Sequence, residues 1–406
     1  MLWSVAWRNI WRSKVRSLVI ICALTIGISA GVFTWALYEG MVIQRIKSAI
    51  KTEASHIQLH HKKYLEDPDV KYFINNSNDI RRQIDSMAGV KAATVRLIVN
   101  SMIASAETGS GVQVMGVDPE DESQVTNLHE KILEGAYFEG ARHNPIIIGR
   151  KLAVKLNVNV RSKVVLTMQQ VDGEITRAQF KVAGIFKTSN SIYDEMTVFV
   201  RKTDLTHLIG MDNASGHEIA VLLEDDRTYN DMKDKISASY KNLDVKSWKE
   251  IMPEVSLVEE TMDISMYLIL GIILFALLFG IINTMLMAVL ERVKELGMLM
   301  AVGMNKIKVF IMIMLETILL AFTGSIIGII LGYLFTALLM KTGIDLSAWG
   351  EAYEKLGYDT VIYPVPDILI AVKVTIMVFV TGLIAAIYPA IKALKLKPAE
   401  ALRIDI

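Results

Sequence analysis

The stretch SLVIICALTIGISAGVFTWALY, residues 17–38, contains no charged side chain. At about 1.5 Å of rise per residue, a helix over this stretch exceeds the ~20 residues needed to cross a hydrocarbon core about 30 Å thick. Three similar stretches follow, at 264–290, at 309–340 with only Glu316 charged, and at 368–391 with only Lys373 charged. The chain is therefore predicted to cross a membrane four times, once near its start and three times near its end.

The predicted fold class is an α-helical membrane protein with four transmembrane helices and one large mixed α/β domain outside the cytoplasm. A polar stretch separates the first two spans and supplies that domain, in which we expect two subdomains. The predicted segments are an interfacial helix (1–16), span one (17–40), the α/β domain (41–263), span two (264–290), a cytoplasmic coupling helix (291–308), span three (309–340), a short outer loop (341–367), span four (368–391) and a cytoplasmic tail (392–406).

Basic residues near the span ends predict the orientation, because Lys and Arg are retained on the cytoplasmic side. Such residues precede span one and follow spans two and four, whereas the 341–367 loop contains more acidic than basic residues. Both termini and the 291–308 segment are therefore expected in the cytoplasm, and the 41–263 domain outside it.

The N-terminal segment is interpreted as an uncleaved anchor, because its apolar run is longer than that of a signal peptide. Trp3, Trp7 and Trp11 recur every four residues beside Arg8 and Arg12, which favours a helix lying in the membrane interface; alternatively, span one simply starts early. The single cysteine, Cys22, lies within span one, so no disulfide can stabilise the outer domain.

Alternating apolar patterns predict strands in the outer domain at 91–100, 111–117, 163–170, 175–186, 196–200 and 218–223. Asp172-Gly173 is a strong hairpin signal between two of these strands. Helical patterns cover 78–87, 149–156, 202–209 and 228–240.

Motifs for catalysis are weak. The sequence has no G-x-x-x-x-G-K-[ST] loop, so we expect no enzyme activity or cofactor in this chain and no ATP hydrolysis by that route. Ser29 lies in a G-x-S-x-G pattern, but within a membrane helix rather than the required strand-to-helix elbow. His56, His60 and His61 lack a clear third metal ligand, so a polar strand edge is favoured over a metal site.

Two charged residues lie within the predicted spans, where burial of an ionised group is costly. Glu316 and Lys373 are offset by roughly 12 Å in depth, which argues against a direct pair. Lys373 is expected to extend outward toward the interface. For Glu316 two roles stay open, facing another helix or a cavity near the ATPase, or simple helix packing.

Glycines at four-residue spacing predict close helix packing, because backbones without side chains approach closely. They are Gly27 and Gly31 in span one, and Gly324, Gly328 and Gly332 in span three.

The segment ERVKELGMLMAVGM, residues 291–304, is too polar to span a membrane and is predicted to form a short amphipathic helix. Val293, Leu296 and Met300 share its apolar face. Such a helix is suited to docking on a partner.

This segment resembles the cytoplasmic hallmark E-R-x-[KR]-E-[IL]-G-x-[LM]-[RK]-A-x-G of FtsX-like ABC transporter permeases, with Met300 in place of the usual basic residue. The ending, Tyr388-Pro389-Ala390 and Pro398 to Arg403, resembles the closing motifs of that family. Segments of the outer domain, including Gly116 to Glu122 and Gly184 to Asp194, resemble its lipoprotein-releasing branch. Asn159-Val160-Arg161 departs from the Gly-Asp turn of that branch.

The resemblance implies a permease subunit that works by mechanotransmission with two copies of a cytosolic ATPase. The residues it assigns to ATPase coupling are Glu291, Arg292, Lys294, Glu295, Leu296, Gly297, Met300 and Gly303. The implied partners are a second permease copy or paralogue, membrane lipid, and a periplasmic carrier or lipoprotein cargo, but no nucleic acid. Acyl chains would lie between the first and second spans of two subunits of a bacterial inner-membrane dimer.

Two other functions stay open at this point. One is MacB-like efflux of peptides or drugs from the periplasm. The other is FtsX-like signalling to a cell-wall hydrolase, which the size of the outer domain disfavours.

Overall fold

The computed structural model describes residues 7–8, 12, 14–138 and 144–395. These residues form two compact units. The helical unit contains residues 1–42, 261–344 and 361–406, and the sheet domain contains residues 43–260 and 345–360. Of the predicted interfacial helix, only Trp7, Arg8, Arg12 and the residues from Lys14 onward are described; Trp3 and Trp11 lie outside the described residues.

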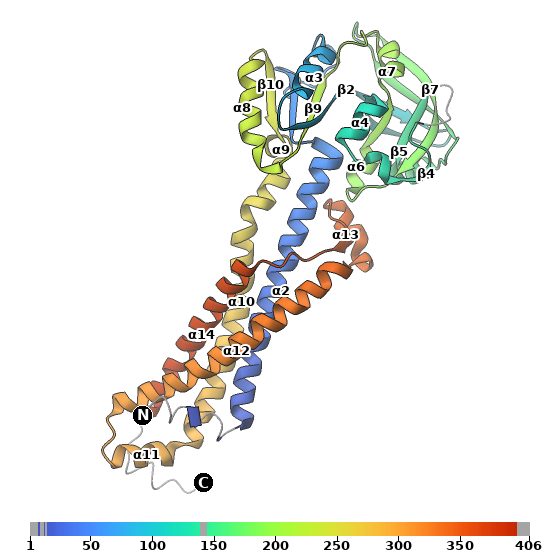
Figure 1. The fold of residues 1–406 in the computed structure, drawn as a ribbon. Helices are drawn as coiled ribbons and strands as arrows, with labels where there is room; N and C mark the ends of the chain where they lie inside the picture. Colours follow the sequence, from blue (N-terminus) through green and yellow to red (C-terminus); the bar gives the residue numbers. More distant parts are fainter. Residues whose placement is uncertain (1–6, 9–11, 13, 139–143, 396–406) are drawn as a thin grey trace. The chain divides into compact units, whose positions relative to one another are not determined.

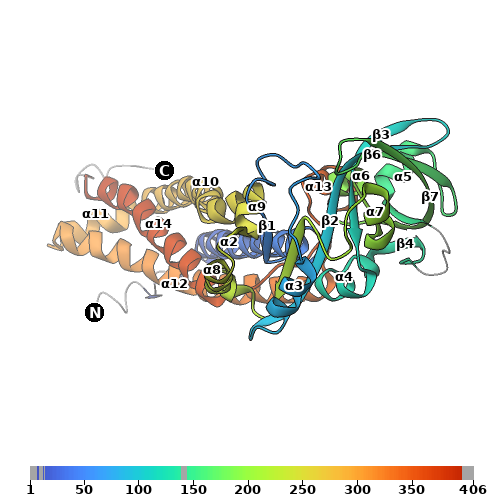
Figure 2. The same cartoon turned by 90° about the horizontal axis from the view of Figure 1, so that it is seen from above.

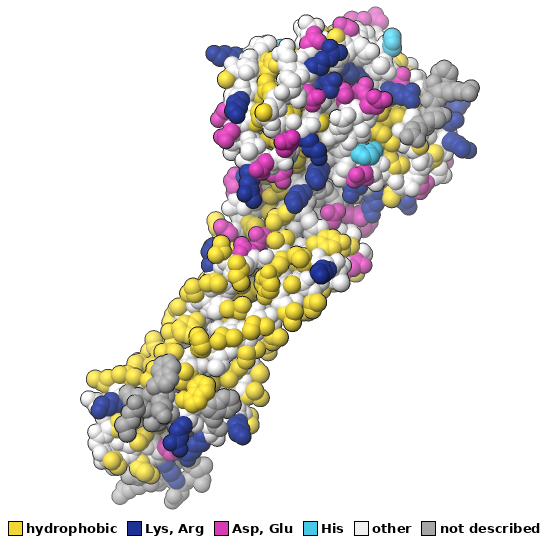
Figure 3. All heavy atoms as spheres, in the orientation of Figure 1, with side chains coloured by type: hydrophobic (Ala, Val, Ile, Leu, Met, Phe, Trp, Pro, Cys, Tyr) yellow, Lys and Arg dark blue, Asp and Glu magenta, His cyan; other side chains and the backbone are white. Residues whose placement is uncertain are grey.

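Four long helices are apolar enough to cross a membrane, and they run side by side in the helical unit (Figure 1). Their bounds, with those of the short helix that joins two of them, are α2 (Lys14–Ser48), α10 (Pro253–Glu291), α11 (Val293–Ala301), α12 (Lys306–Thr342) and α14 (Ile368–Leu394). Apolar side chains cover the visible face of these helices (Figure 3). An exposed apolar surface this extensive is typical of a protein embedded in lipid.

Two of these helices are longer than their apolar stretches. Helix α2 continues through a π-helix, η1 (Ala49–Ala54), and α10 begins at Pro253, well before the predicted start of span two. Proline suits the first turn of a helix, where its missing N–H costs nothing. The apolar stretch shows which part of each helix can lie in lipid. The helical hydrogen bonds continue beyond that stretch, so hydropathy alone does not locate the helix ends.

The sheet domain contains a ten-stranded mixed sheet with the order β10-β1-β9-β2-β3-β8-β5-β7-β4, and β6 pairs with β2 and β7. The strands are β1 (Ile57–His61), β2 (Val90–Ala104), β3 (Gly109–Val117), β4 (Ile132–Gly135), β5 (Pro145–Gly149), β6 (Lys163–Gln169), β7 (Ile175–Phe186), β8 (Thr197–Arg201), β9 (Glu218–Leu223) and β10 (Leu243–Ser247). The shorter helices are α3 (Ser77–Asp85), α4 (Pro119–Val125), η2 (Leu128–Lys131), α5 (Arg150–Leu156), α6 (Ser191–Met196), α7 (Lys202–Ile209), η3 (Asp226–Thr228), α8 (Tyr229–Ser239) and α9 (Trp248–Ile251). The six predicted strands and four predicted helices of this domain are confirmed, with small shifts at their ends.

Strand β2 joins two cores along this sheet (Figure 2). Its first half, Val90–Arg96, pairs with β9, and its second half pairs with β3 and β6. One core packs around Ile57, Val221 and Ile236, and the other around Val114 and Phe180. The Asp172-Gly173 hairpin between β6 and β7 is also confirmed, with Gly173 at φ +91° in the left-handed region that glycine favours.

One prediction for the polar segments, the polar strand edge at the histidines, is wrong. Strand β1 is not an edge strand, because it pairs with β10 on one side and β9 on the other, and His56 and His60 are buried. The outer segment 341–367, predicted as a short loop, joins α12 to α14. It contains β11 (Ile344–Asp345), η4 (Ser347–Trp349), α13 (Gly350–Lys355) and β12 (Val361–Ile362), and Glu354 pairs with Lys187 of the same unit at 2.7 Å.

Candidate coupling site

The connection between α10 and α12 is a short helix with a defined turn at its end. Helix α11 follows Arg292 and ends at Ala301. Gly303 then adopts φ +98°, and the N–H of Met304 donates to the carbonyl of Leu299. This glycine-dependent C-terminal turn redirects the chain into α12. The side chain of Asn305 accepts a hydrogen bond from the N–H of Ile307 and so caps the N-terminus of α12.

The apolar face of α11 packs inside the helical unit. Val293, Leu296 and Gly297 are buried, and Met300 is half-buried against the same core. The opposite face exposes Glu291, Lys294 and Met298, with 57% of Met298 accessible. The apolar face of α11 is therefore covered by the chain itself, and the accessible surface beside it carries charged side chains.

The side chain of Arg292 turns inward to a carboxylate on α12. Its Nη1 lies 3.1 Å from both carboxylate oxygens of Glu316, and its Nε donates to Glu295 at 3.2 Å. The side chains of Arg292 and Glu316 are only 16% and 8% exposed. Glu316 therefore has a charged partner outside its own helix, which accounts for a carboxylate within an apolar span.

The charged contacts continue to the N-terminal segment. Nη2 of Arg12 lies 2.6 Å from Glu295, so Arg12, Glu295, Arg292 and Glu316 form one chain of alternating charges. The outer end is accessible, since 68% of the Arg12 side chain is exposed. This series joins Arg12, which precedes α2, to α11 and α12.

The span-three glycines lie against α2. A Cβ atom on Gly324 or Gly328 would lie 2.9 Å from Cβ of Leu24 or Ile28, and one on Gly332 would lie 3.1 Å from Cα of Ser29. The hydroxyls of Thr25 and Ser29 donate to the carbonyls of Gly324 and Gly328. The Ser29 hydroxyl is thus part of helix packing, not of a nucleophile elbow.

The span-one glycines face the other two long helices. A Cβ on Gly27 would lie 3.3 Å from Leu277 of α10, and one on Gly31 would lie 2.9 Å from Val374 of α14. Lys373 is exposed on α14 and forms no ion pair with the described residues. The ion-pair partner of Glu316 is Arg292 of the preceding connection, not Lys373.

No group of three potential metal ligands occurs among the described residues, and this includes the histidines of β1. The predicted motif residues Pro398 to Arg403 lie outside the described residues, whereas Tyr388 and Pro389 lie within α14.

Family models cover both ends of this architecture. The MacB-like periplasmic core domain matches residues 17–239, more than half of the chain, and the FtsX-like permease C-terminal domain matches residues 267–398. The chain is an ABC transporter permease of the FtsX/MacB family. The second match contains α11, Arg292 and Glu316, so this ion pair lies in the permease C-terminal domain, whereas Arg12 lies outside that match.

Similar proteins include lipoprotein-releasing and macrolide-export proteins. The permease is 24% identical to the lipoprotein-releasing system transmembrane protein LolC of Xylella fastidiosa. The match covers 77% of this chain and 78% of LolC. It is 22% identical to LolE of Haemophilus influenzae, with 98% of each chain covered. It is also 24% identical to the macrolide export ATP-binding/permease protein MacB of Chlorobium luteolum, over 98% of this chain but only 59% of that protein.

Reasoning from the sequence missed the partner of Glu316 in the permease. Arg292 was assigned to the ATPase-facing residues because it lies in the hallmark motif. The signal was available in principle, since a carboxylate within an apolar span needs a cation and Arg292 lies at the cytoplasmic end predicted for the preceding span. Its direction depends on the turn between α10 and α11, which residue spacing alone does not specify.

Proposed function

We propose that this permease is the membrane subunit of a transporter that releases lipoproteins from the inner membrane of a bacterium and passes them to a carrier. The observation that carries the proposal is the fraction of each relative's length that this chain covers. The chain covers 98% of LolE, whereas it covers 59% of MacB, a protein named as both ATP-binding and permease. The absence of a phosphate-binding loop in the sequence also favours an ATPase on a separate chain.

The proposed mechanism places α11, both termini and the 291–308 segment in the cytoplasm and the sheet domain in the periplasm, as the distribution of basic residues favours. Two ATPase subunits would bind ATP and Mg²⁺ and close, pressing on the exposed face of α11 with Glu291 and Lys294. Arg292 would transmit this displacement to Glu316 and hence to α12. Helices α2 and α10 continue past their apolar stretches, so they are suited to act as stiff levers.

The energetic requirement for ATP follows from the cargo. Withdrawal of acyl chains from lipid costs about 0.8 kcal/mol for each CH₂ group. Several chains therefore require more free energy than a binding protein supplies by contact alone. A second permease copy or paralogue would complete the apolar site between subunits.

Efflux of peptides or drugs is the second candidate, because the MacB relative is as similar in identity as LolC. To separate the two, the tagged chain is purified gently from native membranes and the retained proteins are identified by mass spectrometry. An ATPase together with acylated lipoproteins is expected. An ATPase with an adaptor and no acylated polypeptide would replace lipoprotein release by efflux.

A direct assay complements the purification. Proteoliposomes containing the permease, its ATPase and an acylated lipoprotein are supplied with ATP and a soluble carrier. Release is expected to depend on ATP and on the acyl chains, so the same lipoprotein without acyl groups serves as the control. Equal release of both forms would contradict the proposal.

A further inference from the structure

A pocket of about 300 Å³ lies within the sheet domain and has not been given a role above. Its volume is at the lower end of the range for small-molecule sites. Apolar walls come from Leu65, Met115 and Met252, and the polar groups include His60 and Glu218. The pocket thus combines an apolar body with a few convergent polar groups, which is the usual composition of a ligand site.

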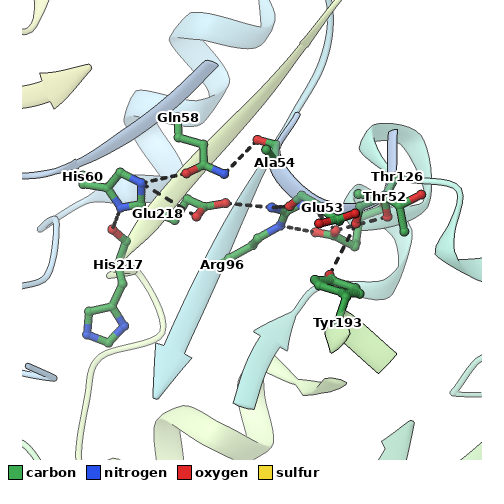
Figure 4. Close-up of polar contacts among 11 residues, drawn as sticks. Thr52, Glu53, Ala54, Gln58, His60, Arg96, Thr126, Tyr193, His217 and Glu218 are labelled. Atoms are coloured by element: carbon green, nitrogen blue, oxygen red, sulfur yellow. Dashed lines mark hydrogen bonds and ion pairs between the residues drawn. The ribbon is translucent and has the colours of Figure 1, made fainter. Parts of the chain in front are cut away.

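Polar residues that line the pocket, among them His60 and Glu218, belong to a buried network around Arg96 (Figure 4). Arg96 is 1% exposed and donates through Nε and Nη2 to the two oxygens of Glu122, at 3.1 and 2.8 Å. Its Nη1 donates to Oε1 of Glu218 at 2.7 Å. The guanidinium therefore binds two carboxylates. It donates two hydrogen bonds to Glu122 and one to Glu218.

Glu218 is left incompletely paired. Its other oxygen, Oε2, lies 3.8 Å from Nε2 of His60, and no hydrogen bond from the described residues reaches it. The side chain is 4% exposed and lines the pocket. Burial raises the pKa of Glu218 above its ordinary value despite the attraction of Arg96. One shared guanidinium thus does not fully compensate this carboxylate.

His60 does not supply the missing charge at neutral pH. Burial lowers the pKa of His60 to about 4, although the carbonyl of His217 favours its charged form. Its two ring nitrogens lie 3.0 Å from Oε1 of Gln58 and 3.2 Å from the carbonyl of His217. A neutral imidazole has one N–H and can donate to only one of these oxygens. One of these two oxygens therefore receives no hydrogen bond from His60.

The charge balance agrees with the hydrogen-bond count. Arg45 pairs with Glu53 at 2.9 Å, so two guanidinium groups meet three carboxyl groups, Glu53, Glu122 and Glu218. When all three are ionised, one negative charge is in excess. An anionic ligand would be repelled, and a wholly apolar one would leave Glu218 buried without a second partner.

We propose that this pocket binds a protonated amine or guanidinium group carried on an apolar body. The cationic head would donate to Oε2 of Glu218, and the body would contact Leu65, Met115 and Met252. The same chemistry is available in a small cationic amphiphile and in a Lys or Arg side chain of a peptide.

Some residues that line the pocket lie in segments adjacent in sequence to two long helices, α2 and α10. Glu53 and Ala54 end the π-helix η1, and Met252 immediately precedes α10. Ser55, next to η1, adopts φ 61° and ψ −174°, a strained conformation for a residue with a side chain. Strain and π-helical turns often occur at functional segments. A bound ligand would therefore contact segments that can respond to it.

The test uses the full chain in lipid nanodiscs and two probes of matched shape, 4-phenylbutylamine and 4-phenylbutanol. Binding is measured by isothermal titration, with empty nanodiscs as the blank. The amine is expected to bind with a Kd at least ten-fold lower than that of the alcohol. Equal affinities, or no binding of the amine above the blank, would overturn the proposal.

Two variants locate the site. Glu218→Gln is expected to abolish the preference for the amine, but it also alters the Arg96 network and can impair folding. Leu65→Trp fills the pocket from a residue that is 42% exposed and leaves the network intact, so amine binding should be lost. Leu133→Trp, at a leucine that is 52% exposed on β4 and outside the pocket, is the matched control. Amine binding that survives Leu65→Trp would refute this location.

A competition experiment separates the two sources of the cation. If acetyl-Leu-Lys-Leu-amide displaces 4-phenylbutylamine, the site accepts a peptide side chain, whereas displacement only by other small amines identifies a small-molecule site. Both results support the cation pocket. Neither requires transport activity, so failure here is distinguishable from failure of lipoprotein release.

Discussion

Arg96 in the sheet domain and Arg292 in the helical unit both meet buried carboxylates, but in different settings. Arg96 is 1% exposed and lies within one sheet, held by Glu122 and Glu218. Arg292 is 16% exposed, lies between two helices and is followed by the accessible pair of Glu295 and Arg12. The first arrangement fixes a fold and borders a pocket. The second connects α11 to α12, and its outer end at Arg12 is accessible.

The largest expected effect tests the enclosed network. Arg96→Met leaves Glu122 and Glu218 buried without a cation, which should cost about 3 to 5 kcal/mol of unfolding free energy in the sheet domain. Pulse proteolysis in urea measures this loss. Arg150→Met, at an accessible pair with Glu134, is the control and should change stability by about 1 kcal/mol or less. Similar losses in both variants would show that the Arg96 network adds no special stability.

The second effect concerns the pH dependence of the sheet domain. Nδ1 of His217 accepts from the N–H of Ile98 at 3.0 Å, and Nε2 donates to the carbonyl of Val70 at 2.9 Å, which fixes a neutral ring. Burial lowers the pKa of His217 to about 4 from an ordinary 6.5. Between these values the unfolded chain binds a proton that the folded chain does not, so stability falls as the pH falls from about 6.5 to 4. The loss should approach about 3 kcal/mol.

Unfolding free energies between pH 7.5 and 4 check this prediction. His217→Gln should remove its part of the slope, and the remaining slope comes from groups such as His60, whose pKa is lowered in the same direction. The exposed His129→Gln variant is the control and should keep the full slope. A His217→Gln variant with an unchanged slope would contradict a neutral, buried role for this ring.

The two arginines also show where sequence reasoning reaches its limit. Four spans and six strands were predictable because lipid exposure and sheet alternation repeat along neighbouring residues. The inner position of β1 was not, since IQLHH is polar yet becomes buried through pairing with β9 and β10. Arg96 lies in an alternating strand that gives no indication of two acidic partners. Each partner lies at least 26 positions away in the sequence.

At the coupling site the limit is geometrical. The hallmark motif located α11, and the turn at Gly303 agrees with a helix end. The inward direction of Arg292 depends on how α10 ends and α11 begins. The same applies to η1, because a π-helical turn has no reliable signal in residue type.

A third effect tests how closely α2 and α12 must pack. Gly328→Ala places a methyl group 2.9 Å from Cβ of Ile28, an atom fixed to the backbone, so the helices must separate. Overpacking of this kind costs about 1 to 3 kcal/mol. Calorimetry in nanodiscs measures the change. Gly271→Ala in α10 is the control, since its Cβ meets nothing within 4 Å and alanine favours a helix. A neutral Gly328→Ala would remove close packing as the reason for this stripe.

The smallest expected effect comes from the pair of Arg292 and Glu316, and it changes transport activity rather than stability. If the pair transmits the movement of α11, Arg292→Gln and Glu316→Gln should each lower ATP-driven release by about ten-fold, which corresponds to about 1.4 kcal/mol. The amount of ATPase that copurifies should stay constant, because the exposed face of α11 is unaltered. Arg12→Gln, at the accessible end of the series, should cost less than either.

The double variant decides between transmission and two separate roles. If Arg292 and Glu316 act only through their contact, either single substitution already removes the whole contribution of the pair. The double variant should then release lipoprotein as slowly as either single variant and no slower. Two independent contributions would instead multiply to a loss of about a hundred-fold. That result would assign Arg292 to contact with the ATPase and Glu316 to helix packing. A non-multiplicative result with constant ATPase binding would assign the pair to the step after docking, in which motion of α11 becomes motion of α12.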